Sequence, residues 1–92
     1  GYDLALEELS AALPAGETAE SALAARELAR LVQRFLDTLS QADRVIFLGR
    51  YAFLDSYAQI AARTGLSEKN VSVRLSRIRK RLKAYLTEQE VL

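Results

Sequence analysis

Apolar residues recur at helical spacing along most of the chain, and no stretch alternates apolar and polar residues as a half-buried strand would. The clearest stripe lies near the C-terminus and consists of Val71, Leu75, Ile78 and Leu82. Steps of four, three and four residues bring these side chains to one face of a helix. An earlier stripe consists of Leu28, Leu31, Val32, Phe35 and Leu39. This periodicity predicts an all-α fold.

Polar side chains that can cap helices mark where the helices should begin. Such residues are Thr18, Ser40, Ser56 and Ser67, whose oxygens can accept a hydrogen bond from a free N–H group of the next turn. Gln59 follows Ser56 by three residues, which predicts a capping box. The expected helices run from Thr18 to about Leu39, from Gln41 to about Ala52, and from Ser56 to the turn formed by Gly65, Leu66 and Ser67. A last helix follows this turn and ends at about Glu88.

The predicted architecture is a small helical bundle of about four helices containing a helix-turn-helix, with an N-terminal arm or short helix. Residues 1–17 are expected to form the connector or arm, because a short amphipathic stretch over 2–13 is followed by a break at Pro14 and Gly16. Residues 18–92 are expected to form the domain. Its predicted core is Leu28, Leu31, Val32, Phe35, Leu39, Val45, Leu48, Tyr51, Ile60, Ala61, Leu66, Val71, Leu75, Ile78 and Leu82.

The helix-turn-helix is predicted from the last two helices and the turn between them. Gly65 can adopt the left-handed conformation that ends a helix, and Ser67 can cap the next one. Three residues separate the two helices, which is about the length that this motif needs. In such a motif the second helix enters the major groove of DNA.

The composition excludes several classes of function. The 92 residues include neither cysteine nor histidine, so a structural zinc site, a cysteine nucleophile and a Ser-His-Asp arrangement are all ruled out. No glycine-rich phosphate loop and no long apolar run is present. We therefore expect no enzyme, no cofactor or metal, no small-molecule substrate and no membrane segment. The chain begins at Gly1 rather than Met, so we expect a piece of a longer protein.

The net charge of +1 hides an asymmetry between the two halves of the chain. Residues 1–43 contain eight Asp or Glu and three Arg, which gives −5. Residues 44–92 contain four Asp or Glu and ten Lys or Arg, which gives +6. Seven of these cations lie between Lys69 and Lys83, where no acidic residue occurs. The second half is therefore the part that nucleic acid would attract.

The last helix carries its charges on the side away from its apolar stripe. Residues on the opposite face are Lys69, Val73, Ser76, Arg77 and Lys80, and those on the flanks are Asn70, Ser72, Arg74, Arg79 and Arg81. A basic face on an isolated helix is more often a solvated surface. Because this helix is second in a capped pair, DNA binding is the favoured interpretation. Tyr57 fits either a core aromatic or a contact to a DNA phosphate.

Three segments carry a resemblance to a known family. They read LxxLxxADRxIFLxRY over 36–51, SYxxIAxxxGLSxxxV over 56–71, and RLxRxRxxL over 74–82. Together they resemble the C-terminal domain of bacterial sigma factors, especially those of the extracytoplasmic-function group. The resemblance implies a cytoplasmic protein that binds the −35 element of a promoter while attached to RNA polymerase core through the β-subunit flap. An anti-sigma factor is a further candidate partner.

The resemblance also implies roles for particular residues. Contacts from the second helix fall on Ser72, Val73, Ser76 and Arg77, and backbone contacts from the supporting helices fall on Arg50 and Tyr57. Ser72 and Val73 depart from a common basic-then-serine pair, so the bound promoter sequence does not transfer. The complete set of candidate DNA-binding residues is Arg50, Tyr57, Lys69, Asn70, Ser72, Val73, Arg74, Ser76, Arg77 and Lys80.

Two other classes of protein remain open from the residues alone. An autonomous helix-turn-helix regulator, or a response-regulator output domain of the LuxR kind, has a similar four-helix outline. Such a regulator would be expected to dimerise and bind a palindrome. A pure interaction bundle could instead dock its basic helix on an acidic partner. The small side chains of Ser72, Val73 and Ser76 favour close approach to base edges over that alternative.

Overall fold

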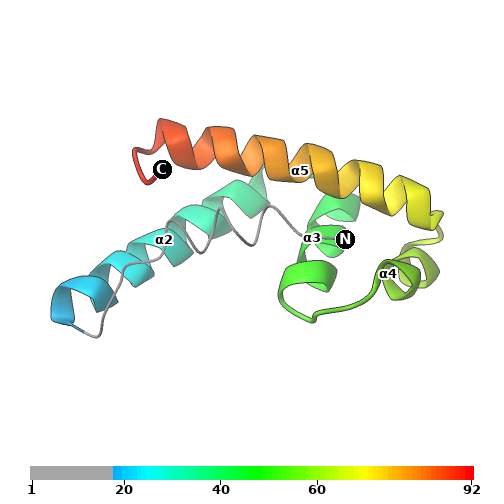
Figure 1. Cartoon of the computed structure of the whole chain (residues 1–92), viewed down its shortest axis with the longest axis horizontal. Coiled ribbons are helices and arrows are strands. Elements are labelled where there is room, and N and C mark those ends of the chain that lie inside the picture. Colours follow the sequence, from blue (N-terminus) through cyan, green and yellow to red (C-terminus); the bar gives the residue numbers. More distant parts are fainter. Residues whose placement is uncertain (1–17) are drawn as a thin grey trace. The chain divides into compact units, whose positions relative to one another are not determined.

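In a computed structural model of the chain, residues 18–92 are described, and they form four α-helices and no strand (Figure 1). The helices are α2 (Ala19–Asp37), α3 (Gln41–Tyr51), α4 (Tyr57–Thr64) and α5 (Glu68–Glu88). The predicted all-α fold class is confirmed. The expected N-terminal arm or short helix over 1–17 lies outside the described residues.

Each predicted cap is formed. Thr18 and Ser21 close a reciprocal capping box at the start of α2, and the Oγ of Ser40 accepts a hydrogen bond from the N–H of Asp43 at 3.2 Å. Ser56 caps α4, and the Oγ of Ser67 accepts from the N–H of Asn70 at 3.1 Å at the start of α5. α2 ends two residues before the predicted end at Leu39, with Thr38 as its C-cap.

The described residues divide into two compact units. One comprises residues up to Thr38 together with Leu82–Leu92, so it contains α2 and the last part of α5. Within this unit the rings of Phe35 and Tyr85 lie 5.6 Å apart, centroid to centroid. Its buried side chains are Leu28, Phe35, Leu82 and Leu86.

The second unit, Leu39–Arg81, contains α3, α4 and the first part of α5. α3 and α4 approach closely at Gly49, where an added Cβ would lie 3.2 Å from Cγ1 of Ile60. Gly49 therefore serves packing between helices, and it interrupts neither the helix nor its hydrogen bonds. The buried side chains of this unit are Leu39, Ile46, Phe47, Ile60, Val71, Leu75 and Ile78.

The predicted core is correct for the stripe of α5 and wrong for the face of α3. Val45 was expected inside and is 36% exposed, whereas Ile46 and Phe47 are 0% and 3% exposed. The cause is that α3 carries apolar residues at four successive positions, so periodicity does not select one face. Leu86 is a further buried residue that was not in the predicted core. The half-buried members of the predicted core are Leu31, Val32, Leu48, Tyr51, Ala61 and Leu66.

Candidate nucleic-acid interface

The turn between α4 and α5 has the local geometry of a helix-turn-helix. Gly65 has φ of 76° and ψ of 7°, and its N–H donates to the carbonyl of Ala61 at 2.9 Å. The hydroxyl of Thr64 donates to the carbonyl of Ile60 at 2.8 Å, so the last turn of α4 is held on both its backbone and its side chain. Leu66 and Ser67 complete the connection to α5. The predicted three-residue turn is thus formed by the predicted residues.

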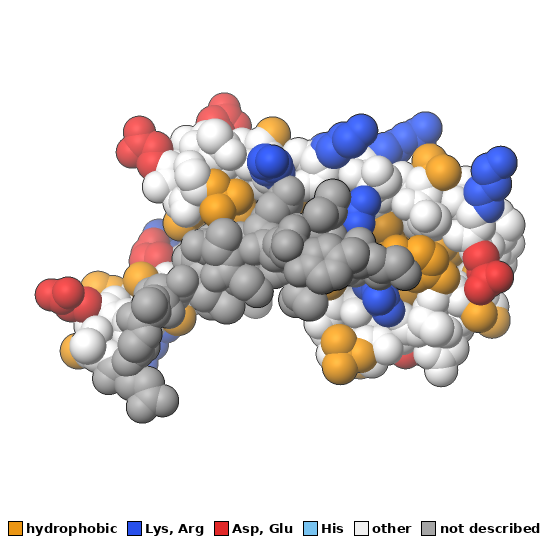
Figure 2. Space-filling view, viewed as in Figure 1, with side chains coloured by type: hydrophobic (Ala, Val, Ile, Leu, Met, Phe, Trp, Pro, Cys, Tyr) orange, Lys and Arg blue, Asp and Glu red, His pale blue; other side chains and the backbone are white. Residues whose placement is uncertain are grey.

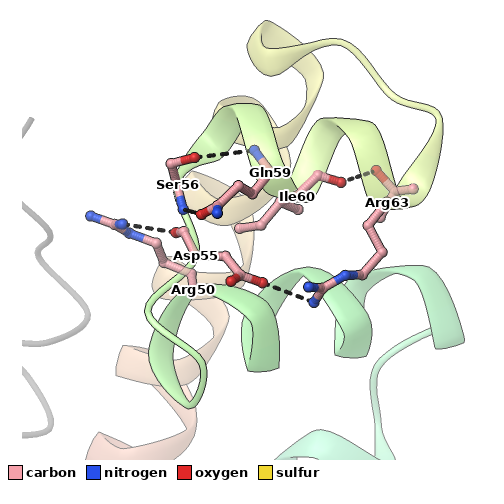
Figure 3. A network of polar contacts seen from close by, with 7 residues as sticks. Arg50, Asp55, Ser56, Gln59, Ile60 and Arg63 are labelled. Carbon is pink, nitrogen blue, oxygen red and sulfur yellow. Dashed lines mark hydrogen bonds and ion pairs between the residues drawn. The ribbon is translucent and has the colours of Figure 1, made fainter.

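The start of α4 is equally well defined. The N–H of Gln59 donates to the Oγ of Ser56 at 3.1 Å, and the N–H of Ser56 donates to Oε1 of Gln59 at 2.8 Å (Figure 3). This reciprocal pair satisfies two groups that would otherwise lack partners at a helix start. It sets Tyr57 as the first residue of α4.

Two candidate contact residues from different helices are brought together at this point. The guanidinium of Arg50, in the last turn of α3, lies 5.3 Å from the centre of the Tyr57 ring. Nη1 of Arg50 also donates to the backbone carbonyl of Asp55 at 3.0 Å (Figure 3). The cation therefore rests over an aromatic face while both side chains stay partly accessible. A phosphate that approached this corner would meet the guanidinium of Arg50 beside the ring of Tyr57.

Asp55 forms a second link between the connection before α4 and the end of that helix. Its Oδ2 lies 2.8 Å from Nη1 of Arg63, and its side chain is 14% exposed (Figure 3). The ion pair joins the residue before the cap of α4 to the last turn of the same helix. This contact was not predicted, because the eight-residue separation carries no periodic signal.

The outward face of α5 presents most of the remaining candidate residues to solvent. The exposed ones are Lys69, Asn70, Ser72, Val73, Arg77 and Lys80, whereas Arg74 and Ser76 are half-buried. Val73 is 39% exposed, although it is a large apolar side chain. The opposite face holds Val71, Leu75 and Ile78, each at most 1% exposed. The structure therefore confirms the predicted apolar face of this helix and exposes most of the predicted outward face, with Ser76 as the half-buried exception.

The charge on α5 has one sign over most of its length. Figure 2 shows Lys and Arg side chains spaced along this helix and acidic side chains near its C-terminal end. The first turn contains one acidic residue, Glu68, and none follows until Glu88. A helix with this distribution attracts a polyanion along its middle section.

Arg74 differs from the other candidate residues of α5 because its side chain forms an ion pair with another helix. Its Nη1 donates to Oδ1 of Asp43 at 3.1 Å, which pairs α5 with the first turn of α3. The two residues are 31 positions apart, so the sequence offered no sign of this pairing.

Residues 18–92 contain no group of three or more side chains that could together hold a metal ion. None of the described helices combines the length and the apolar character that crossing a membrane requires.

These features define a helix-turn-helix DNA-binding domain. The family described as "Sigma-70, region 4" matches residues 29–82, more than half of the chain. The chain belongs to this family, which is a DNA-binding part of the sigma factors that direct RNA polymerase to promoters. No curated protein and no solved structure matches the chain.

Proposed function

We propose that this chain reads the −35 element of a promoter as part of a sigma factor of the extracytoplasmic-function group. The observation that carries the proposal is the outward face of α5, which combines small side chains with cations and follows a capped three-residue turn. Membership of the sigma-70 region 4 family supports the same role. The role requires binding and no catalysis.

The proposed division of labour follows from side-chain chemistry. Arg77 is suited to a bidentate contact with a guanine edge, and the methyl groups of Val73 are suited to a thymine methyl. Ser72 and Ser76 are short, so they allow the helix to approach the bases closely. Lys69, Asn70 and Lys80 would bind phosphates at the rims of the groove. Base preference then comes from the middle of the face, and affinity comes from its edges.

The corner formed by Arg50 and Tyr57 would hold the neighbouring sugar–phosphate backbone. The first helix of a helix-turn-helix crosses the backbone, and Tyr57 is the first residue of α4. Because Arg50 is already ordered by the ring and by the carbonyl of Asp55, binding a phosphate would immobilise little additional side-chain freedom. This corner would fix the register in which α5 meets the bases.

The proposed partners besides promoter DNA are RNA polymerase core, with the β-subunit flap as the docking element, and an anti-sigma factor. We also propose a cytoplasmic location, a connector role for residues 1–17, and residues 18–92 as the DNA-binding domain. These proposals, like the partners, rest on membership of the family. One short reading helix should bind weakly when isolated. Attachment to polymerase would raise the effective concentration of the domain at its site.

Selection from a pool of duplexes randomised over the candidate −35 segment, with and without polymerase core, tests this function. We expect the isolated chain to enrich one short, non-palindromic motif weakly, and with strong salt dependence. Adding core polymerase should sharpen the same motif. Enrichment of a palindrome with two chains per site would instead favour the autonomous regulator. Absence of any enriched motif in both arms would contradict the proposal.

A further inference from the structure

The ion pair between Asp43 and Arg74 removes one cation from the face that would meet DNA. The side chain of Arg74 is 36% exposed and that of Asp43 is 23% exposed, with 3.1 Å between Nη1 and Oδ1. Partly buried charges are screened less by salt than fully exposed ones. The guanidinium is therefore drawn towards α3 by a partner that persists at ordinary ionic strength.

Both members of the pair are fixed by their own helices. Asp43 lies in the first turn of α3, where its N–H is capped by Ser40 and the following turn buries Ile46. Arg74 precedes the fully buried Leu75 on α5. Neither backbone can shift without disturbing the core of the unit. The two side chains are therefore held within ion-pairing distance of each other.

The position of Arg74 makes this pairing consequential. It follows Val73 in sequence and lies three positions before Arg77, so it flanks the face proposed to read bases. A free guanidinium at this flank could reach a phosphate or a guanine edge, because an arginine side chain is long and carries five donors. A contact of that kind needs no particular bases. It would therefore strengthen binding most on duplexes that lack the motif, where α5 is free to settle wherever Arg74 reaches the DNA, and less on the selected duplex, where base contacts fix the register of α5.

We propose that Asp43 is a specificity-determining positioning residue, which holds Arg74 off the DNA so that base preference depends on the exposed middle of α5. This inference rests on the proposed promoter-reading function. Asp43 touches no DNA itself and acts through Arg74. Arg74, which belongs to the set of candidate contacts, becomes an internal partner in this account.

The experiment measures the affinity of the 92-residue chain for its selected −35 duplex and for a scrambled duplex, each against salt concentration. The variants are Asp43→Asn, Arg74→Gln and the double variant. In Asp43→Asn, the released Arg74 should steepen the log–log salt slope by about 0.9, the amount for one added phosphate contact. Affinity for the scrambled duplex should rise roughly threefold at moderate salt. Affinity for the selected duplex should rise less, so discrimination between the duplexes should fall, by up to about the same factor.

Matched controls separate this effect from a general change in charge. Glu68→Gln removes one negative charge from the first turn of α5 and leaves Asp43 in place. Any gain in affinity that it causes should persist in the Arg74→Gln background, whereas the gain from Asp43→Asn should disappear there. Asp43→Glu keeps a carboxylate and should restore discrimination towards the wild-type value.

Arg74→Gln gives a second test that does not depend on the folding of Asp43→Asn. We expect it to keep the wild-type salt slope, since Arg74 makes no contact to DNA in this account. A slope shallower by about 0.9 would overturn the inference, as would a gain from Asp43→Asn that survives without Arg74. A wild-type chain that does not distinguish the two duplexes would overturn the proposed function, and this inference with it.

Discussion

Two connections flank α4, and each contains one residue with left-handed backbone. Leu54, before the helix, has φ of 57°, and Gly65, after it, has φ of 76°. Glycine adopts this conformation without a Cβ penalty, whereas another residue loses about 1–2 kcal/mol. The left-handed backbone of the later connection follows from the intrinsic conformational freedom of Gly65. In the earlier connection, Leu54 adopts this backbone conformation although its Cβ makes it unfavourable.

The surroundings of Leu54 explain how the unfavourable conformation is maintained. On one side, the N–H of Phe53 donates to the carbonyl of Leu48 at 3.1 Å, and on the other, the N–H of Asp55 donates to the carbonyl of Gly49 at 2.9 Å. The side chain of Leu54 is itself 80% exposed and contributes little to the core. The difference teaches that a turn determined by its own residue is visible in sequence, while a turn determined by neighbouring hydrogen bonds is not.

The largest effect is expected away from both connections, in the stripe that buries α5. Leu75→Ala should lower the free energy of unfolding by about 2–5 kcal/mol, because Leu75 is 1% exposed. The adjacent Ser76→Ala should change it by about 0.5 kcal/mol in either direction. Urea unfolding followed by circular dichroism compares the two. Equal losses would show that the helices depend on local signals more than on the core.

An intermediate effect is expected at the later connection. Gly65→Ala should lower the free energy of unfolding by about 1–2 kcal/mol, which is the cost of left-handed backbone in a residue with a Cβ. Apart from Gly65 itself and its chain neighbours, no heavy atom lies within 4 Å of the position of that Cβ, so no steric clash with the rest of the fold should add to the cost. The same unfolding assay measures it. A loss as large as that of Leu75→Ala would mean that the turn does more than end α4.

The smallest effect, with the opposite sign, is expected at the earlier connection. Leu54→Gly removes the penalty of about 1–2 kcal/mol but makes the unfolded chain more flexible, which offsets about 0.4–1 kcal/mol. The net result should be a gain of up to about 1 kcal/mol in the free energy of unfolding. If the variant is instead destabilised, the exposed Leu54 side chain must contribute contacts that outweigh the backbone penalty.

Local signals predicted most of this fold. The caps at Thr18, Ser40, Ser56 and Ser67 depend on residues three positions apart, and all of them form. The exposed and buried faces of α5 are also correct, because that helix has a single continuous apolar stripe with charges opposite. Such features need only a few residues of sequence to specify them.

Features that depend on tertiary contacts could not be predicted in the same way. The predicted buried face of α3 was wrong, because Val45 and Ile46 are both apolar and only tertiary packing decides which of them is buried. The pairing of Asp43 with Arg74 joins distant residues and changes the expected role of one candidate. The contact between Arg50 and Tyr57 joins two candidates that the sequence presented separately.

The central claim is that the middle of the exposed face of α5 reads bases while its edges bind phosphates. Selection from a randomised −35 pool with the wild-type, Arg77→Ala and Lys80→Ala chains tests it directly, because both substitutions remove one exposed cation. Arg77→Ala should change the enriched base at one position, where it should lose about 1–3 kcal/mol of discrimination. Lys80→Ala should weaken binding evenly across sequences and leave the motif unchanged. Identical motifs from all three chains would contradict the account.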